Sequence, residues 1–266
     1  MGRKITFCLL GLLIVLAIGY GGSRFYFHLT DGFSVSNITP QVPLNDWMAS
    51  PITTEIRQIL GQPFYYKAKG CQTYVLVSED GNYVLKFFKF KHLNKRWIEY
   101  LPGLSIFAAK QEAARARREK KTELLFNGYT LAYQRLPQET GILFLHFNTS
   151  NELGLITTIY DKLGIAHALD MSQQIFVLQR YAEPLTKKTD PIQLENDIRA
   201  LITARIAQNI IDHDPALLQN VGYINGKLIY LDVGQFASSI PSTSVDPETE
   251  IQVRVSEIPA WFERKK

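Results

Sequence analysis

The spacing of hydrophobic and polar residues changes several times along the chain, and each change marks an expected element. Residues 64–90, FYYKAKGCQTYVLVSEDGNYVLKFFKF, contain three runs rich in aromatic and β-branched residues. The runs are broken at Lys69-Gly70 and at Asp80-Gly81, and Asp-Gly between such runs is the strongest short-range signal of a hairpin. The pattern therefore predicts a three-stranded antiparallel meander.

Two later segments have the composition and spacing of helices. Residues 108–136 contain no proline and are rich in Ala, Lys, Arg, Glu and Leu, which favours one long helix with a charged, solvated first half. Residues 190–212 predict a second helix, with Asp190 as N-cap and Pro191 at the first helical position. The predicted apolar face of that helix consists of Ile198, Leu201, Ile202, Ile206 and Ile210.

Strand character returns around these helices. Residues 140–148, 153–170 and 174–185 are rich in β-branched and aromatic residues, and 161–164 is a turn candidate. A hairpin-like YINGKLIYL follows at 223–231, and a short helix fits 51–60. The order is strands, helix, strands, helix, loop and hairpin, which predicts an α+β fold with an antiparallel sheet.

Composition narrows the class of protein. A chain of 266 residues with 46% hydrophobic and 12% aromatic content can bury a large core, as one domain or two small lobes, and is not a disordered chain. The net charge of +4 is modest and locally balanced, so no nucleic acid partner is expected. The two cysteines, Cys8 and Cys71, exclude a disulfide framework and a cysteine-rich metal site.

The N-terminal segment 1–23 predicts membrane targeting. A basic start is followed by an uncharged run whose strongly apolar part, 5–20, is short against the roughly 20 residues of a spanning helix. An uncleaved anchor is favoured, and a cleaved signal that leaves a secreted protein is the alternative. Arg3 and Lys4 against the lone Arg24 then place a single-pass protein's C-terminal body outside the cytoplasm.

Chemistry-bearing residues gather in 213–236, HDPALLQNVGYINGKLIYLDVGQF. Asp214, Asn220 and Asp232 lie close together in the chain, and Asp232 opens an Asp-Val-Gly sequence. Carboxylate and amide oxygens are the hard ligands that Mg²⁺ prefers. Earlier in the chain, Lys86 lies in the third strand of the predicted meander.

These residues, in this order, resemble the motifs of the protein-kinase-like superfamily. There a third-strand lysine contacts the nucleotide phosphates, and a loop with Asp and Asn, followed by Asp-x-Gly, handles the substrate hydroxyl and the metal ions. The resemblance implies a two-lobed fold with ATP and Mg²⁺ as cofactors. Lys86 would contact the phosphates and Asn220 and Asp232 the metal. Asp214 would be catalytic, with Asp212 as a second candidate.

The resemblance also implies a hinge and a helix glutamate. Residues 174–185 look like the family's strand that runs into the hinge, and Gln179 and Tyr181 are the candidates there for nucleotide binding. Glu119 is the candidate partner of the strand lysine, but Glu112 and Glu123 lie on the same predicted helix and periodicity does not choose among them.

Several departures from the family pattern indicate a minimal, divergent member. The Gly-rich loop is reduced to KGCQTYV with one glycine, and Asp214 precedes Asn220 by six residues instead of five. No Ala-Pro-Glu follows, and only 30 residues remain after Phe236. The predicted division is a targeting segment (1–23), a connector (24–62), a kinase-like N-lobe (63–182) and a reduced C-lobe (183–266).

Three functions remain open at this point. The first is an ATP- and Mg²⁺-dependent phosphotransferase that acts on a hydroxyl. The second is a pseudokinase-like binding module that presents a surface to a protein partner, and the third is a membrane-tethered structural protein without nucleotide. Each motif also has a plain structural interpretation: Lys86 as a snorkelling edge residue, Asp232-Val-Gly as a turn, and the basic cluster 115–121 as a solvated helix face, with anionic lipid as its functional alternative.

Overall fold

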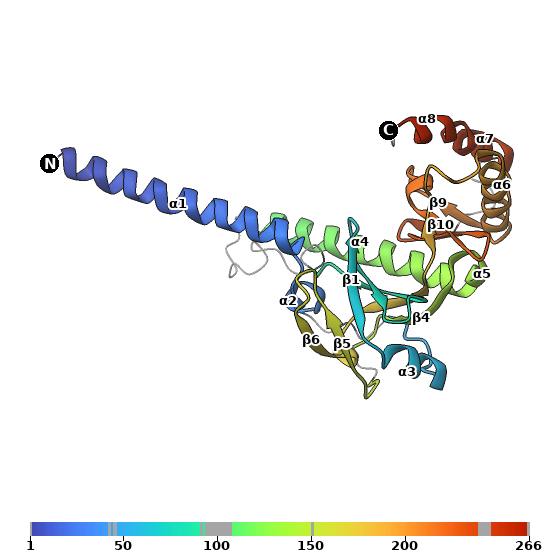
Figure 1. The fold of residues 1–266 in the computed structure, drawn as a ribbon, viewed down its shortest axis with the longest axis horizontal. Coiled ribbons are helices and arrows are strands. Elements are labelled where there is room, and N and C mark those ends of the chain that lie inside the picture. Colours follow the sequence, from blue (N-terminus) through green and yellow to red (C-terminus); the bar gives the residue numbers. More distant parts are fainter. Residues whose placement is uncertain are drawn as a thin grey trace.

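The computed structural model describes residues 2–41, 44, 47–90, 93, 108–149, 152–238 and 246–264. A long first helix, α1 (Gly2–Thr30), projects from the body with the N-terminus at its far end (Figure 1). The body consists of a large sheet with the helix α4 (Ala108–Arg135) packed on it, and of a smaller, helix-rich C-terminal part. The prediction of an α+β fold, with an antiparallel N-terminal sheet and a reduced C-terminal part, is confirmed.

The large sheet has seven strands in the order β4-β7-β3-β2-β1-β5-β6. The pairs are antiparallel except for β1 with β5, which are parallel. The strands are β1 (Phe64–Lys69), β2 (Thr73–Ser78), β3 (Tyr83–Phe88), β4 (Ile142–His146), β5 (Ile156–Tyr160), β6 (Ala166–Asp170) and β7 (Phe176–Arg180). The predicted meander is β1, β2 and β3, and its Asp80-Gly81 turn places Gly81 at φ 75°, a conformation that glycine adopts without strain.

The lysine strand β3 lies inside this sheet, between β2 and β7, and both of its faces are covered. Leu85 and Phe87 pack in a core that includes the short helix α3 (Thr54–Leu60), whereas Phe88 packs in a second core with residues of α4. Because side chains alternate along a strand, Lys86 lies on the same face as Phe88, toward α4. The interpretation of Lys86 as a solvated edge residue is therefore wrong.

The C-terminal part starts with α6 (Pro191–Ala207), which is shorter than predicted. The N-cap is confirmed, because Ile192 N donates to Asp190 Oδ1 at 3.0 Å. The helix does not reach residue 212: Asn209 has φ 55°, and the chain then enters β9 (Ile210–Asp212), which pairs with β12 (Phe236–Ser238). Backbone pairing with a distant strand thus overrides the local apolar pattern.

The predicted hairpin is present as β10 (Val221–Ile224) and β11 (Lys227–Tyr230), which β8 (Glu183–Pro184) extends to three strands. Its turn residues Asn225 and Gly226 both have positive φ, as a two-residue hairpin turn requires. The remaining elements are α2 (Val35–Ile38), α5 (Pro137–Thr140), η4 (Met171–Gln173), η5 (Leu217–Gln219), α7 (Pro247–Ser256) and α8 (Ile258–Arg264).

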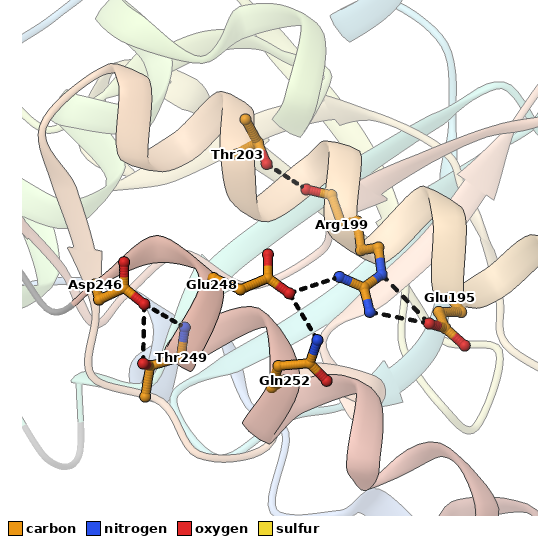
Figure 2. Close-up of polar contacts among 7 residues, drawn as sticks. All are labelled: Glu195, Arg199, Thr203, Asp246, Glu248, Thr249 and Gln252. Carbon is orange, nitrogen blue, oxygen red and sulfur yellow. Dashed lines mark hydrogen bonds and ion pairs between the residues drawn. The ribbon is translucent and has the colours of Figure 1, made fainter.

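Polar contacts join α7 to α6 in this part of the molecule (Figure 2). The guanidinium of Arg199 donates to Glu195 on its own helix and to Glu248 on α7, each at 3.1 Å. Glu248 also accepts from Gln252 at 2.6 Å, and Asp246 caps α7 through Thr249 N at 3.0 Å. Of these contacts, the pair between Arg199 and Glu248 joins the two helices, and the others lie within α6 or within α7 and its cap.

The predicted membrane anchor is wrong. In the part of the chain that the structure describes, none of the helices combines the length with the apolar character that a bilayer crossing requires. Helix α1 continues through the predicted boundary at residue 23 and includes Arg24 and His28 beyond the apolar run 5–20, which itself falls short of about 20 residues. The localisation built on that segment, with the body outside the cytoplasm or secreted, is withdrawn with it.

The end of α1 is instead tied to the large sheet by charge. Asp31 pairs with Lys69 of β1 at 2.8 Å and with Lys162 of the β5–β6 turn at 3.0 Å, and it accepts a hydrogen bond from the Tyr66 hydroxyl at 2.9 Å. These contacts, above all that with Lys69, hold the pKa of the Asp31 carboxyl well below its usual range. The helix is thus attached where it meets the first strand.

Candidate functional site

Lys86 is the central cation of the candidate site. Only 7% of its surface is exposed, and its Nζ donates to the backbone oxygen of Leu231, the residue just before Asp-Val-Gly. Burial lowers the pKa of Lys86 to about 8, and the nearby charge of Asp232 opposes that shift. A buried ammonium group of this kind is well suited to receive an anion.

Asp232 faces this lysine from the Asp-Val-Gly turn. Its Oδ1 accepts hydrogen bonds from Gly234 N at 3.0 Å and from the Tyr129 hydroxyl of α4 at 3.3 Å. Burial, reinforced by the charge of Asp232, raises the pKa of Tyr129 well above its usual value, so this hydroxyl remains a donor. The interpretation of Asp232-Val-Gly as a turn is thus correct for the local structure. The turn uses Asp232 Oδ1, and the second carboxylate oxygen, Oδ2, is left for another contact.

Two glycines let α4 pack directly on this turn. A Cβ added at Gly128 would lie 2.5 Å from the backbone oxygen of Val233, and one added at Gly234 would lie 2.7 Å from Leu125 Cδ1. Real Cβ atoms do not approach other atoms this closely, so Gly128, which faces a backbone oxygen, must be glycine, whereas a side chain at Gly234 would require Leu125 to shift. The long helix therefore sets the position of Asp232.

The structure brings the side chains of Asp214 and Asn220 into contact. Asn220 Nδ2 donates to Asp214 Oδ2 at 3.0 Å, and Gln235 Nε2 reaches the same oxygen at 3.3 Å. The 3-10 turn Leu217–Gln219 lies between Asp214 and Asn220, and Leu231 N donates to Asn220 O at 2.7 Å. The Asp/Asn loop and the Asp-x-Gly segment are therefore linked by both backbone and side chains.

Asp212 lies beneath this loop. Its Oδ1 accepts from Asp214 N at 2.9 Å, and burial raises the pKa of its carboxyl. Arg254 of α7 donates to the backbone oxygens of Asp214 and Pro215, at 2.8 and 2.7 Å. In this arrangement Asp212 supports the conformation of the loop that carries Asp214, and both residues are half-buried.

The predicted hinge residues already have protein partners. Gln179 is buried on β7, and its Nε2 donates to Thr140 O and, at 3.1 Å, to Tyr230 O. The backbone N–H of Tyr181 donates to Asn82 O at 2.8 Å. A nucleotide base would have to displace at least the Tyr181 bond in order to use that amide.

The predicted glutamate partner is not brought to the lysine. The side chain of Glu119 is 56% exposed and pairs with Arg115 on the same helix at 2.9 Å. Glu112 and Glu123 are exposed as well. The α4 side chain that does reach the site is Tyr129, so the assignment of Glu119 to the nucleotide site stays a prediction without a contact to support it.

The candidate site offers both carboxylate and amide oxygens that a metal ion could bind. Among the residues with described positions, no group of three or more His, Cys, Asp or Glu side chains is arranged to hold a metal. In that same part of the chain, Asp232 Oδ2 and Asn220 Oδ1 make no hydrogen bond, and both are hard oxygens of the kind that Mg²⁺ binds. The residues therefore suit the predicted cation in kind, through amide and carboxylate oxygens together.

Sequence reasoning missed three residues of this site: Gln72, Tyr129 and Gln235. Gln72, in the turn between β1 and β2, has an Oε1 atom 3.6 Å from the point where a Cβ on Gly234 would lie. An isolated glycine inside a helical pattern, Gly128, was the one available signal, because such a glycine usually marks close packing. No local pattern pointed to either glutamine.

No family model matches the chain, and no curated protein sequence matches it. Among solved structures, a 2.2 Å crystal structure of WbdD is similar at a TM-score of 0.41 and 12% identity, over 73% of this chain and 37% of that one. A co-crystal structure of WbdD with the kinase inhibitor LY294002 is similar at 0.36 and 11%, over 65% and 33%. The chain thus spans about a third of the length of these structures, and at this distance the roles of its residues rest on the contacts described above.

Proposed function

We propose that this protein is a divergent, kinase-like phosphotransferase that binds ATP with Mg²⁺ and acts on a hydroxyl group. One observation supports this most: Lys86, buried on an interior strand, is directed to the Asp-x-Gly segment of the C-terminal part. A buried lysine is costly unless it is paired, and the contact with Leu231 O leaves its charge only partly compensated. Nucleotide phosphates would complete that compensation.

Each acidic residue then has a role that its contacts support. Asp232, held by Tyr129 and Gly234 N through one oxygen, would bind the cation through the other, and Asn220 Oδ1 would be a second oxygen ligand. The bound Mg²⁺ would neutralise negative charge on the transferring phosphoryl group. Asp214, oriented by the amides of Asn220 and Gln235, would orient the acceptor hydroxyl.

A second function is favoured by the contacts at the hinge. Because the Tyr181 amide and the Gln179 side chain are bonded within the protein, a pseudokinase-like module that keeps the fold and binds a protein partner is the alternative. The distinction lies in ligand binding: the enzyme must exchange the Tyr181–Asn82 bond for a nucleotide contact, whereas the binding module keeps it.

The test compares Asp232→Asn with Asp80→Asn in the full chain. Asp80 opens a similar turn, with Oδ1 accepting from Asn82 N at 3.0 Å, but lies in the β2–β3 connection. We expect MgATP to raise the Tm of the wild type and of Asp80→Asn by several degrees, and to leave Asp232→Asn unchanged. Phosphoryl transfer to hydroxyl acceptors should follow the same pattern.

The outcomes separate the two functions. A Tm shift without any phosphoryl transfer would favour a nucleotide-binding pseudokinase. No shift with any purine nucleotide, with or without Mg²⁺, would refute the phosphotransferase proposal and leave the protein-binding module.

A further inference from the structure

The turn between β1 and β2 holds Gln72 in a defined place above the candidate site. Lys89 N donates to Gln72 O at 2.8 Å, and Gly70 N donates to Thr73 O at 2.9 Å. Lys89 Nζ also donates to Gly70 O. The turn is therefore fastened to the end of β3, the strand that carries Lys86.

The side-chain oxygen of Gln72 lacks a partner. Its Oε1 is buried and accepts no hydrogen bond from any residue that the structure describes. A buried carbonyl oxygen without a donor is unfavourable, and the great majority of such groups in folded proteins are satisfied by protein, water or a bound group. This atom therefore indicates a ligand that the site holds in its working state.

The surroundings of Oε1 indicate the chemistry of that ligand. The point where a Cβ on Gly234 would lie is 3.6 Å from Gln72 Oε1 and 3.3 Å from Asp232 Oδ1, so the amide oxygen and the carboxylate both lie beside Gly234, while Leu125 Cδ1, at 2.7 Å, occupies that point itself. Both are acceptors, and Asp232 carries negative charge. One ligand that satisfies an amide oxygen and a carboxylate together is a hard divalent cation.

We propose that Gln72 Oε1 and the Asp232 carboxylate together hold a divalent cation, with the β1–β2 turn supplying an oxygen ligand. The inference rests on the proposed function in that the cation accompanies the nucleotide phosphates. It also accounts for the single glycine of the turn: the turn contributes a side chain to the site, where a Gly-rich loop contributes backbone amides.

The experiment uses the full chain and Mn²⁺ as the probe, first alone and then with ATP. Gln72→Leu removes the oxygen and Gln72→Glu replaces it with a carboxylate. Gln62→Glu is the matched control, because Gln62 also lies beside an aspartate, Asp80, but its Oε1 already accepts from Asp80 N at 3.2 Å. Mn²⁺ binding is measured by electron paramagnetic resonance, and Tm is measured with and without the metal.

The two Gln72 substitutions should change the metal-free Tm in opposite directions. Gln72→Leu should raise the metal-free Tm by a few degrees, because an unsatisfied oxygen is lost, and should weaken Mn²⁺ binding at least tenfold. Gln72→Glu should lower the metal-free Tm through repulsion with Asp232, and Mn²⁺ should restore it. Gln62→Glu should bind Mn²⁺ as the wild type does.

Equal Mn²⁺ affinity in the wild type and Gln72→Leu would overturn the inference. The same holds if Mn²⁺ does not raise the Tm of Gln72→Glu. ATP binding by a wild type that takes up no Mn²⁺ would refute the cation site and keep nucleotide binding. Conversely, Mn²⁺ binding that depends on Gln72 without any ATP binding would support the cation site and refute the proposed function.

Discussion

Replacing the buried Lys86 with methionine should stabilise the ligand-free protein. Burial lowers the pKa of this lysine from 10.5 to about 8, and each pKa unit corresponds to 1.36 kcal/mol, so the charged lysine destabilises the folded state by about 3 kcal/mol at pH 7. Lys86→Met removes that term but leaves Leu231 O without its donor, which costs about 1–3 kcal/mol. The net gain at pH 7 is therefore between roughly 0 and 2 kcal/mol.

The pH dependence is the sharper part of this prediction. The unfolded lysine keeps its proton until about pH 10.5, whereas the folded one releases it near pH 8. Between these values the unfolded state binds more protons, so the wild type gains stability as the pH rises. From pH 7 to 9.5 it should gain about 2 kcal/mol relative to Lys86→Met, because only the wild type carries this group.

Urea unfolding at pH 7, 8, 9 and 9.5 measures this difference, with the exposed Lys67→Met as control. The contribution of the buried tyrosines is common to all three proteins and cancels when their stabilities are compared. Parallel pH curves for the wild type and Lys86→Met would mean that Lys86 titrates as an ordinary lysine, and the argument for a strained cation at this site would fail.

Two further changes probe how the site and α1 are attached. Asp31→Asn should destabilise the protein by about 1 kcal/mol at pH 7, discounted for solvent exposure. Because the pKa of folded Asp31 is lowered, the difference in acid unfolding curves should shrink as the pH falls below about 4, where the unfolded carboxyl takes up its proton, and should vanish only where the folded carboxyl is protonated as well. Gly128→Ala should lower the free energy of unfolding, measured by urea denaturation, by about 2 kcal/mol, because the added Cβ would lie 2.5 Å from Val233 O. Gly19→Ala in α1 is the control: nothing lies within 4 Å of the added Cβ, so this change should be neutral or stabilising. Equal effects of the two changes would refute the packing argument.

Local signals predicted the local elements. Asp80-Gly81 and Asn225-Gly226 adopt the positive φ values that their hairpins need, and Asp190 caps α6 through its own side chain. Each of these depends on residues within a few positions of one another, which a sequence displays directly.

Features that depend on distant partners were beyond the sequence pattern. The end of α6 is determined by the pairing of β9 with β12, and α4 presents Tyr129 to the site while Glu119 turns to Arg115. Helical periodicity offers several glutamates at similar positions and cannot rank them. The apolar run of α1 was misread because composition alone does not show where a helix ends and which polar residues it includes.

Helix α4 contacts Asp232 at the candidate site and makes no hydrogen bond with Lys86 among the described residues. In the family that the motifs resemble, a helix glutamate pairs with the strand lysine; here α4 reaches Asp232 through the Tyr129 hydroxyl and contacts the turn through Gly128. The helix therefore contacts the Asp232 carboxylate and not the lysine. It follows that a displacement of α4 would disturb the predicted metal site first, while Lys86 would keep its contact with Leu231 O.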